Sequence, residues 1–394
     1  MRELIRRIGA GLKSVFESIW HYLGSLAAVC LFAAVLGLGI FHAVVQDAPL
    51  RFLCYAGVYN PAGAEPPRGI YAMGVNAEPG VPHVRLEYSA DGVLQRMRSV
   101  DEAGRLAALP GSQVAEQRLY YNKQARLVRK ENRGVSGALA ADAQGVAVRE
   151  FGYDASGQLN HIVYRDATGK LTVPRYPGFA ECRISHDTHG RPLLIEYLGS
   201  EGEPLVNAEG EQRVVYEYDD AARSSTRSNY IAGQLAENRQ GVARECEHMQ
   251  PGGTCRRWQN AAGEPVSNAA VGAAELRLES GAAPGVVRRL FLNCQGEPCA
   301  GNRACAEHLV RLNRAGLPEW ECYGGADGMP VNNPARGYAE RVCDYSDSGV
   351  LEREYFWDAA GNPAPVCERR HTSTPAGRYS LSLHADGASA VQPE

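Results

Sequence analysis

Methionine (5 residues) and phenylalanine (8) are scarce in this chain of 394 residues. Glycine (43) and proline (22) are frequent, and tyrosine (19) outnumbers phenylalanine. The scarcity of methionine and phenylalanine and the many turn-forming residues argue against long core helices. They favour short, tyrosine-bearing strands joined by turns.

An excess of one charge is lacking as well. The formal net charge is -4, and acidic and basic side chains are interspersed along the chain. Nucleic-acid binding needs clustered lysine and arginine, and no such basic field is present. The charges therefore indicate a solvated surface.

Catalytic fingerprints are absent from the sequence. No GxSxG, HExxH, phosphate-binding loop or dinucleotide motif occurs, and the CxxC spacing of zinc sites is missing. His186 and His189 flank Asp187 in one turn, where we expect them to be solvated. Carboxylates that recur with the repeat described below are expected to be structural or surface groups, among them Glu181, Glu275, Glu307 and Glu340. The sequence predicts no enzyme, no cofactor and no metal site.

Residues 18–46 carry no formally charged side chain and include a strongly apolar run at 26–40. At about 1.5 Å per residue, a helix of this length crosses a hydrocarbon core of about 30 Å. The basic residues that precede it are Arg2, Arg6, Arg7 and Lys13. Only Arg51 follows closely, so the amino terminus is predicted to stay in the cytoplasm while the rest is exported.

Cleavage of this segment is the competing interpretation. A signal peptide would have a shorter apolar region, and no small-x-small site stands out at residues 43–48. Lipoprotein cleavage before Cys30 is disfavoured because Val29 is bulky and the apolar run continues beyond it. A permanent single span is therefore predicted.

Turn-like tetrapeptides ending in glycine recur twice in each row of about 32 residues after residue 83. The first set ends at Gly92, Gly157, Gly190, Gly253, Gly285, Gly316 and Gly349, with Ala125 and Ala222 at the same spacing. The second set ends at Gly104, Gly137, Gly169, Gly202, Gly233, Gly263, Gly296, Gly328 and Gly361. A third mark closes several rows, namely GFAE, GAAE and GYAE at Gly178, Gly272 and Gly337, and ACAE at Ala304. We interpret this mark as a tight connection or single helical turn.

The chemistry of the tetrapeptides predicts hairpin turns. Aspartate, asparagine or serine opens many of them, and such a side chain can bond the backbone two residues on. Glycine at the fourth position accepts the left-handed conformation that ends a type I turn with a bulge. Representative turn residues are Asp154, Gly157, Asp166, Gly169, Asp187, Gly190, Asp358 and Gly361. Aliphatic and tyrosine-rich segments between the turns predict strands at residues 158–164, 192–197, 214–218 and 351–357.

One of these turns, Tyr153-Asp154-Ala155-Ser156-Gly157-Gln158-Leu159, resembles the tyrosine-aspartate repeats of bacterial RHS-type proteins. Weaker echoes lie at Tyr218-Asp219, at residues 345–351 and at Trp357-Asp358-Ala359-Ala360-Gly361. The resemblance implies a curved or spiral β-sheet that acts as a shell, stalk or binding surface without catalysis. Two features depart from that family: the period here is longer, and no toxin domain is found at the carboxy end.

The predicted fold is mainly β. It is an elongated array of about nine three-stranded β-repeats in a spiral or superhelical antiparallel sheet, preceded by one transmembrane α-helix. A parallel β-solenoid is the main alternative, and a propeller is disfavoured because about 32 residues hardly supply four strands. The predicted divisions are a cytoplasmic tail (1–17), the transmembrane helix (18–46), a linker (47–82), the array (83–370) and a flexible tail (371–394).

Of the 11 cysteines only Cys30 lies in the apolar segment, so an even number remains for the exported part. An even number in an exported chain indicates disulfides. Cys246 and Cys255 flank one turn, and Cys294 and Cys299 flank another, so each pair is predicted to close a hairpin. Free thiols would be expected if the topology were reversed.

These features favour a bacterial inner-membrane protein that holds a periplasmic β-repeat array as a scaffold or protein-binding surface. Its predicted partners are the membrane and an envelope protein, with no nucleic acid, while any small-molecule ligand is left open. One alternative is a receptor-like or envelope-stress component that signals through a membrane partner. The other is a protein acting on glycan or peptidoglycan, which would need two close carboxylates in a deep pocket.

Overall fold

The computed structural model describes residues 52–59, 63–74, 81–89, 91–108, 112–281, 283, 285–302, 304–347, 349–374, 377–384 and 389–393. The predicted cytoplasmic tail (1–17) and transmembrane segment (18–46) lie outside these residues. Within the described ranges no helix is long and apolar enough to span a membrane.

The described secondary structure consists of strands and turns, which confirms the mainly β fold. The amino-terminal strands are β1 (Phe52–Tyr59), β2 (Arg68–Gly74), β3 (His83–Tyr88), β4 (Leu94–Val100), β5 (Glu116–Tyr121), β6 (Leu127–Arg133), β7 (Val148–Tyr153) and β8 (Leu159–Arg165). The central strands are β9 (Glu181–His186), β10 (Pro192–Leu198), β11 (Arg213–Asp219), β12 (Ser224–Ile231), β13 (Gln234–Leu235), β14 (Arg244–Gln250), β15 (Gly253–Gln259) and β16 (Glu275–Ser280). The carboxy-terminal strands are β17 (Val286–Leu292), β18 (Glu307–Leu312), β19 (Pro318–Gly324), β20 (Glu340–Tyr345), β21 (Leu351–Trp357), β22 (Pro363–Thr374), β23 (Gly377–His384) and β24 (Ser389–Pro393).

All of these strands belong to one antiparallel sheet of 24 strands. From β3 onward each strand pairs with the next along the chain, except that β12 pairs with β14 and carries the two-residue β13 as a short hairpin. At the start, β1 lies between β2 and β3. Because every recorded pairing is antiparallel, the parallel solenoid is excluded for the described residues.

Each repeat, called a row below, adds two strands and three turns. The first turn joins the two strands, the second follows the second strand, and the third leads into the next row. After the second turn the chain returns to the sheet at a single bridge, such as Arg133 with Leu139 or Arg165 with Leu171. The prediction of three strands per repeat is therefore wrong: the third segment makes one bridge in place of a strand.

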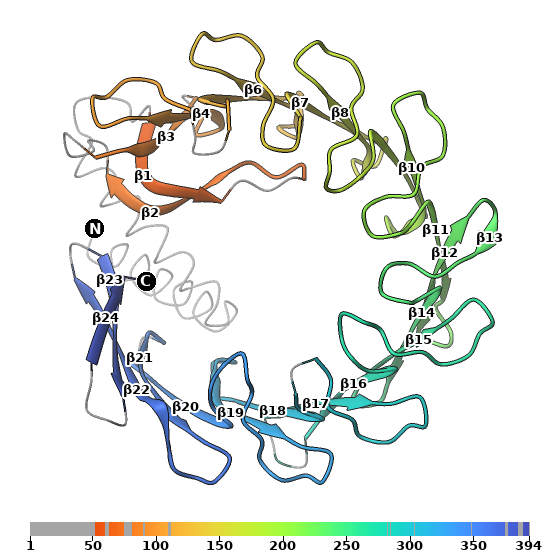
Figure 1. The fold of residues 1–394 in the computed structure, drawn as a ribbon, viewed down its shortest axis with the longest axis vertical. Helices are drawn as coiled ribbons and strands as arrows, with labels where there is room; N and C mark the ends of the chain where they lie inside the picture. The colour runs from red at the N-terminus through yellow and green to blue at the C-terminus, as the bar shows by residue number, and fades with distance from the viewer. Residues whose placement is uncertain are drawn as a thin grey trace, which may run out of the picture.

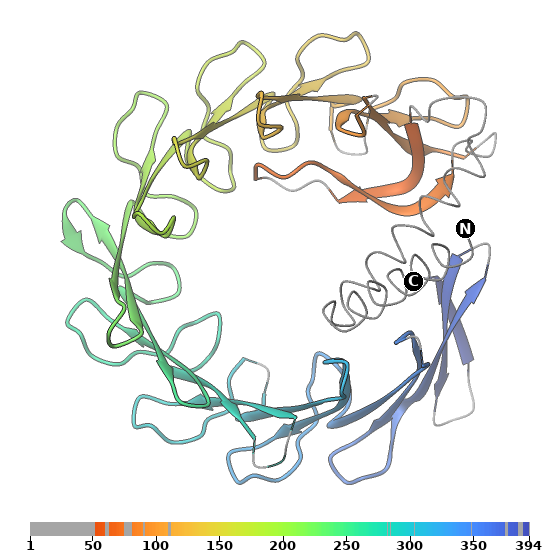
Figure 2. The same ribbon diagram turned by 180° about the vertical axis from the view of Figure 1, so that it is seen from behind.

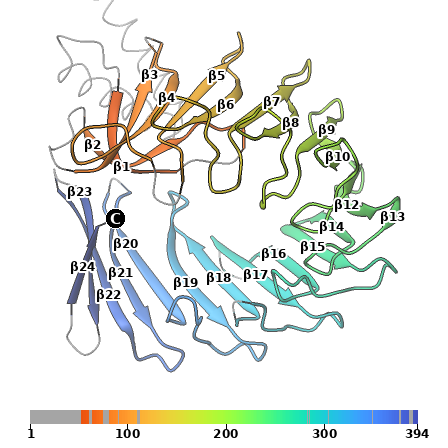
Figure 3. The ribbon, with the colours of Figure 1, turned by 45° about the horizontal axis from the view of Figure 1, so that its top comes forward.

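The sheet curls into an open ring (Figure 1), which the view from behind also shows (Figure 2). Sheet twist that accumulates from strand to strand gives the array this curvature, so it is less extended than predicted. The ring does not close, since among the described strands β24 pairs only with β23 and β2 only with β1. The strands cross the wall of the ring obliquely (Figure 3), so the sheet has an inner and an outer face.

The inner face is apolar at the amino-terminal end of the ring. The β1–β2 hairpin lies inside the ring (Figure 1), and Ala64 in its connection packs against a buried cluster that includes Leu86, Met97 and Leu119. In β3 the inward-facing Leu86 lies between Arg85 and Glu87, which face outward. Further buried inner clusters centre on Phe179 and on Tyr323.

The third turns form a second row of contacts beside the sheet. Backbone amides of one turn donate to carbonyls of the preceding turn, as in Ala208 N to Pro177 O (2.9 Å), Arg239 N to Glu209 O (2.8 Å) and Asn302 N to Val271 O (2.9 Å). From the turn at residues 174–178 to the turn at 301–305, successive rows are thus bonded both through the sheet and through their third turns. This stacking explains how units too small to bury a core alone become stable.

In most rows an alanine ends the third turn and is almost fully buried, whereas Gln212 takes this place before β11. Ala306 is typical: its amide donates to Gly324 O and its carbonyl accepts from Phe291 N, so it bonds both neighbouring strands. The equivalent alanines are Ala115, Ala147, Ala180, Ala243, Ala274 and Ala339. The third mark found in the sequence is this tight turn, its alanine and the first residue of the next strand. At Gly178, Gly272 and Gly337 the glycine amide donates to the carbonyl four residues back, which is a single bond of α-helical spacing.

The sheet extends beyond the boundaries given by the sequence at both ends. Strands β1 and β2 lie in the stretch assigned as a linker (47–82). Strands β23 and β24 lie in the stretch assigned as a flexible tail (371–394), which also contains the end of β22. These edge strands lack the glycine period, which is why the repeat pattern did not include them.

Candidate interaction surface

The outer face carries a ladder of arginine and glutamate side chains. The register places Arg98 of β4 opposite Glu116 of β5, and Glu116 opposite Arg133 of β6. We call these side chains the outer ladder: Glu87, Arg96, Arg98, Glu116, Arg118, Arg129, Glu131, Arg133, Glu150, Arg165, Glu181, Arg183, Arg257, Glu275, Arg277, Arg288 and Glu307. Acidic and basic groups are thereby paired across strands around much of the ring.

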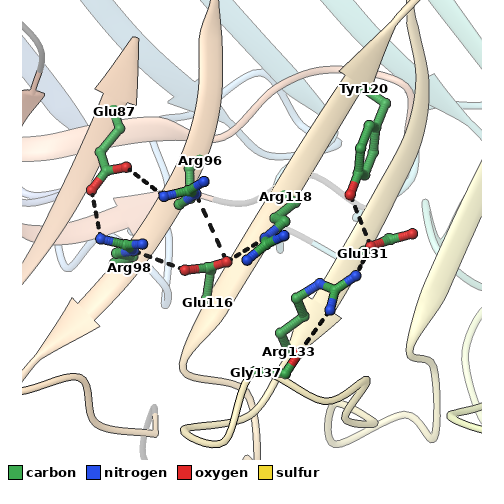
Figure 4. Close-up of polar contacts among 9 residues, drawn as sticks. All are labelled: Glu87, Arg96, Arg98, Glu116, Arg118, Tyr120, Glu131, Arg133 and Gly137. Carbon is green, nitrogen blue, oxygen red and sulfur yellow. Dashed lines mark hydrogen bonds and ion pairs between the residues drawn. The ribbon is translucent and has the colours of Figure 1, made fainter.

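Glu116 is the best-buried member at the amino-terminal end, with 5% of its surface exposed. Arg98 Nε donates to one carboxylate oxygen at 2.8 Å, and Arg118 Nε donates to the other at 2.5 Å (Figure 4). Burial alone would raise the pKa of Glu116, but the bonds from Arg118 and Arg98 outweigh it and hold the pKa below the usual value. This carboxylate is therefore ionised at neutral pH.

Glu131 repeats the arrangement one hairpin further on. Arg133 Nη2 (2.6 Å) and the Tyr120 hydroxyl (3.0 Å) donate to its carboxylate (Figure 4). Arg129 Nε also donates to this carboxylate, at 2.9 Å. Burial raises its pKa, while the bonds from Arg133 and Tyr120 lower it further than burial raises it. Arg133 also donates to Gly137 O at 2.7 Å, and this bond connects the outer ladder to the second turn of the same row.

The recurrent carboxylates found in the sequence occupy the same place in later rows. Glu181 lies 2.5 Å from Arg183 and 3.0 Å from His161, and Glu307 accepts from Arg288. Glu275 pairs with Arg257 at 2.8 Å and with Arg277. Glu340 instead accepts from the Trp320 indole at 2.6 Å. Each follows the buried alanine, so it lies at the first residue of a strand.

Replacing Glu116 by alanine is expected to lower the free energy of unfolding by about 2 kcal/mol, because two charged hydrogen bonds are lost at a buried site. Urea unfolding of the purified full-length chain measures the change. Glu279→Ala is the matched control: this glutamate lies 3.6 Å from Arg288 and both side chains are 37% exposed. The control should lose less than about 1 kcal/mol. Equal losses of stability in the two variants would show that burial of the outer ladder does not increase its contribution to stability.

A second polar cluster is buried on the inner face near the carboxy-terminal end. Glu321, 8% exposed, accepts from the His308 ring and the Tyr323 hydroxyl, both at 2.7 Å, and lies 3.0 Å from Arg341 Nε. Burial raises the pKa of Glu321, but the bonds from His308 and Tyr323 prevail and lower it to about 2. Arg341 also bonds Glu354 at 3.1 Å, which extends the network to β21. Apolar side chains such as Leu86 and Met97 fill the corresponding space at the amino-terminal end of the inner face.

The turn residues named from the sequence have defined roles in the structure. Asp166 Oδ1 accepts from Thr168 N (2.8 Å) and Lys170 N (3.0 Å), and Gly169 has φ +86°. Asp154, Asp187 and Asp358 make the same type of bond to the residue four positions on. Gly157, Gly190 and Gly361 all have positive φ.

Neither predicted disulfide is formed, and for Cys246 and Cys255 the strand register keeps the two cysteines apart. In β14 and β15, Cys246 lies opposite Arg257 and Cys255 lies opposite His248, so the two cysteines are diagonal neighbours. Diagonal Cα atoms in a sheet lie about 7 to 8 Å apart, which exceeds the usual reach of a disulfide. Cys255 Sγ donates to Glu275 at 3.2 Å instead. Cys294 is an exposed free thiol, and Cys299 faces Gly272 O at 3.9 Å.

The histidine turn does not assemble a metal site. His186 lies 3.5 Å from Asp154, whereas His189 is exposed and lies 3.8 Å from Asp187. Across the described part of the chain, no group of three or more histidine, cysteine, aspartate or glutamate residues is placed to hold a metal ion.

Sequence reasoning missed that a third turn recurs in nearly every row. Gly145, Gly210 and Gly241 have positive φ and close turns opened by Asp142, Asn207 and Asn238. The signal was present, because DAQG, NAEG and NRQG follow the same Asx-to-glycine pattern as the first two sets. The outer ladder could have been found from alternating arginine and glutamate on the strands.

Comparison with known proteins yields only distant structural likeness. No family of known proteins matches the chain, and no curated protein matches it in sequence. Two similar solved structures are the crystal structures of TcdB2-TccC3-TEV and TcdB2-TccC3-Cdc42, at 13% and 14% identity and a TM-score of 0.23 each. They cover 77% and 75% of this chain, which spans only 15% and 16% of theirs. A likeness at this TM-score assigns neither fold nor function, so the RHS-type resemblance stays a prediction.

Proposed function

We propose that this chain is a non-catalytic, membrane-anchored protein whose β-repeat ring serves as a scaffold or protein-binding surface in the bacterial envelope. The observation that supports it most directly is the stacking of similar rows, which are bonded through the sheet and, between residues 174 and 305, also through their third turns. Such a stack presents related turns and a charge-balanced outer face at regular intervals. Repeat arrays of this kind bind proteins through extended surfaces.

The anchor in this proposal is the apolar stretch at residues 18–46, with the amino terminus in the cytoplasm and the ring in the periplasm. Because Cys246 and Cys255 are too far apart for a disulfide, they give no reason to place the ring in the periplasm. The orientation therefore rests on the basic residues before the stretch.

Labelling of Cys294 tests the orientation. A membrane-impermeant maleimide, added to cells whose outer membrane alone is permeabilised, should modify this exposed thiol in full-length protein after mild reduction. Mass spectrometry of the peptide that contains Cys294 measures the modification, and Cys294→Ser is the control. Modification only after the inner membrane is broken would place the ring in the cytoplasm and refute this part of the proposal.

Partner binding is tested by cross-linking in cells and purification from gently solubilised membranes. A scaffold or binding surface should recover a reproducible envelope protein in amounts comparable to its own. A partner with its own signalling domain would favour the receptor-like alternative. Recovery of the chain alone, with no cross-linked product, would refute a binding role.

The glycan-acting alternative requires two close carboxylates in one pocket. Three hollows in the described part of the chain are each lined by a single carboxylate, Glu209, Glu279 or Asp91. These hollows give the alternative no support, and the binding role is the one we propose.

A further inference from the structure

A hollow of about 700 Å³ lies where the third turns of four successive rows meet. Its lining comes from residues 144, 173–176, 178, 206–209 and 239, so each row contributes part of the wall. The turn at 174–178 (PRYPG) differs from the others because prolines flank Arg175 and Tyr176. The hollow therefore depends on one row that departs from the repeat.

Exposed apolar side chains gather at this hollow. Tyr176 is 60% exposed, Val173 42% and Val206 40%. They come from two different rows, so their proximity arises from stacking and not from one local apolar segment. Apolar groups that converge on a concavity, in place of single scattered ones, mark a binding surface.

The wall of the hollow is held by the backbone of its neighbours. Tyr176 N donates to Gln144 Oε1 at 3.2 Å, and Gly178 N donates to Pro174 O at 3.1 Å. On the other side, Ala208 N donates to Pro177 O at 2.9 Å. The turn that carries Tyr176 is thus bonded to the rows before and after it, and the site is preorganised.

Two arginines at the hollow differ from those of the outer ladder. The side chains of Arg175 and Arg239 are exposed and make no ion pair or hydrogen bond with any residue that the structure describes. Glu209 is the single acidic residue in the lining, so the charged groups leave one positive charge in excess. Guanidinium groups free of internal partners favour a ligand that carries carboxylates.

The side-chain amide oxygens at the hollow are already engaged. Gln144 Oε1 accepts from Tyr176 N, and Asn207 Oδ1 accepts from Glu209 N (2.8 Å) and Glu211 N (2.9 Å). A sugar needs many directional acceptors and donors around its hydroxyls, whereas an apolar side chain beside a carboxylate needs only the valines, the tyrosine and the arginines. The lining therefore fits a peptide better than a glycan.

We propose that this hollow binds a protein segment in which apolar side chains stand next to aspartate or glutamate. The proposal rests on the proposed function as a protein-binding surface and names one site and one partner chemistry for it. Tyr176, Val173 and Val206 contact the apolar side chains, while Arg175 and Arg239 bond the carboxylates.

A displayed library of random short peptides, selected against the purified full-length chain in detergent, tests this chemistry. Selection on the wild type should enrich peptides that combine apolar and acidic residues. The double variant R175E/R239E should weaken the affinity of the enriched peptides by about tenfold or more, as loss of charged hydrogen bonds implies. Tyr176→Ala should weaken it through lost apolar contact. Fluorescence anisotropy with labelled peptides measures each affinity.

Arg336→Glu is the matched control, because this exposed arginine lies in the third turn of a later row. It should leave peptide affinity unchanged, and circular dichroism should show every variant folded, since the altered side chains are exposed. The proposal would be overturned if selection on the wild type enriched no peptides beyond those enriched on R175E/R239E, or if it enriched basic peptides. Equal binding of the peptides by all variants would overturn it as well. Preference for an acidic oligosaccharide such as oligogalacturonate over the peptides would overturn it too.

Failure of this site can be told from failure of the proposed function. An envelope protein that still co-purifies with R175E/R239E refutes the site and leaves the scaffold role intact. Enriched acidic peptides together with a chain that recovers no partner from membranes would support the site while refuting the broader role.

Discussion

Replacing Glu321 by alanine is expected to lower the free energy of unfolding by about 3 to 5 kcal/mol, the usual effect of breaking a buried, hydrogen-bonded charge network. The His308 ring and the Tyr323 hydroxyl would each lose a bond of 2.7 Å. Arg341 would keep only Glu354 as a partner in the network. Denaturant unfolding, followed by tyrosine and tryptophan fluorescence, measures the loss.

The control for this variant is Glu319→Ala, two residues away on β19. Glu319 bonds Arg311 at 2.6 Å, but the two side chains are 38% and 48% exposed, so its loss should be below about 1 kcal/mol. If Glu321→Ala were as stable as Glu319→Ala, burial of the cluster would not contribute to the stability of the fold.

The same cluster predicts how stability depends on pH. The pKa of Glu321 is about 2 in the folded chain against an ordinary value of 4.5, so the unfolded chain binds its proton more readily. The stabilisation by Glu321 is therefore complete above about pH 5 and is lost as the pH falls toward 2. That shift corresponds to about 3 kcal/mol. The stability difference between wild type and Glu321→Gln, measured in urea at several pH values, should shrink across this range, and a constant difference would contradict the assignment.

Local turn and strand signals allowed much of the sheet to be predicted. The predicted strand at 351–357 coincides with β21, and those at 158–164 and 192–197 differ from β8 and β10 by single residues at their ends. These predictions are confirmed because a short strand between Asx-glycine turns has its ends set locally. Alternation within each strand then decides which side chains share a face.

Features that depend on contacts between rows could not be predicted in this way. The ring curvature arises from twist summed over many strands, and no single residue encodes it. The predicted pairing of Cys246 with Cys255 failed because spacing around a turn does not give the register, which a single residue shift alters. Glu321 resembles the surface carboxylates in sequence, and only the pairing of β18, β19 and β20 brings His308 and Arg341 to it.

Close approach between third turns gives the second large prediction. Gly272 has φ +75°, and a Cβ built on it would lie 2.5 Å from Asn302 N in the next row. Gly272→Ala therefore combines left-handed strain of about 1 to 2 kcal/mol with a backbone clash, for an expected loss of about 3 kcal/mol. The clash would displace the turn whose Asn302 N bonds Val271 O at 2.9 Å.

Gly263→Ala separates the two contributions within the same row. Gly263 has φ +84° but open space around its Cβ position, so only the strain of about 1 to 2 kcal/mol should appear. Hydrogen exchange should show faster opening of β16–β18 in Gly272→Ala, because the bond between the third turns of adjacent rows is weakened there. Equal stability and equal exchange in the two variants would mean that the rows are joined by the sheet alone. The difference between the variants therefore measures how much the row of third turns adds to the stacking of the ring.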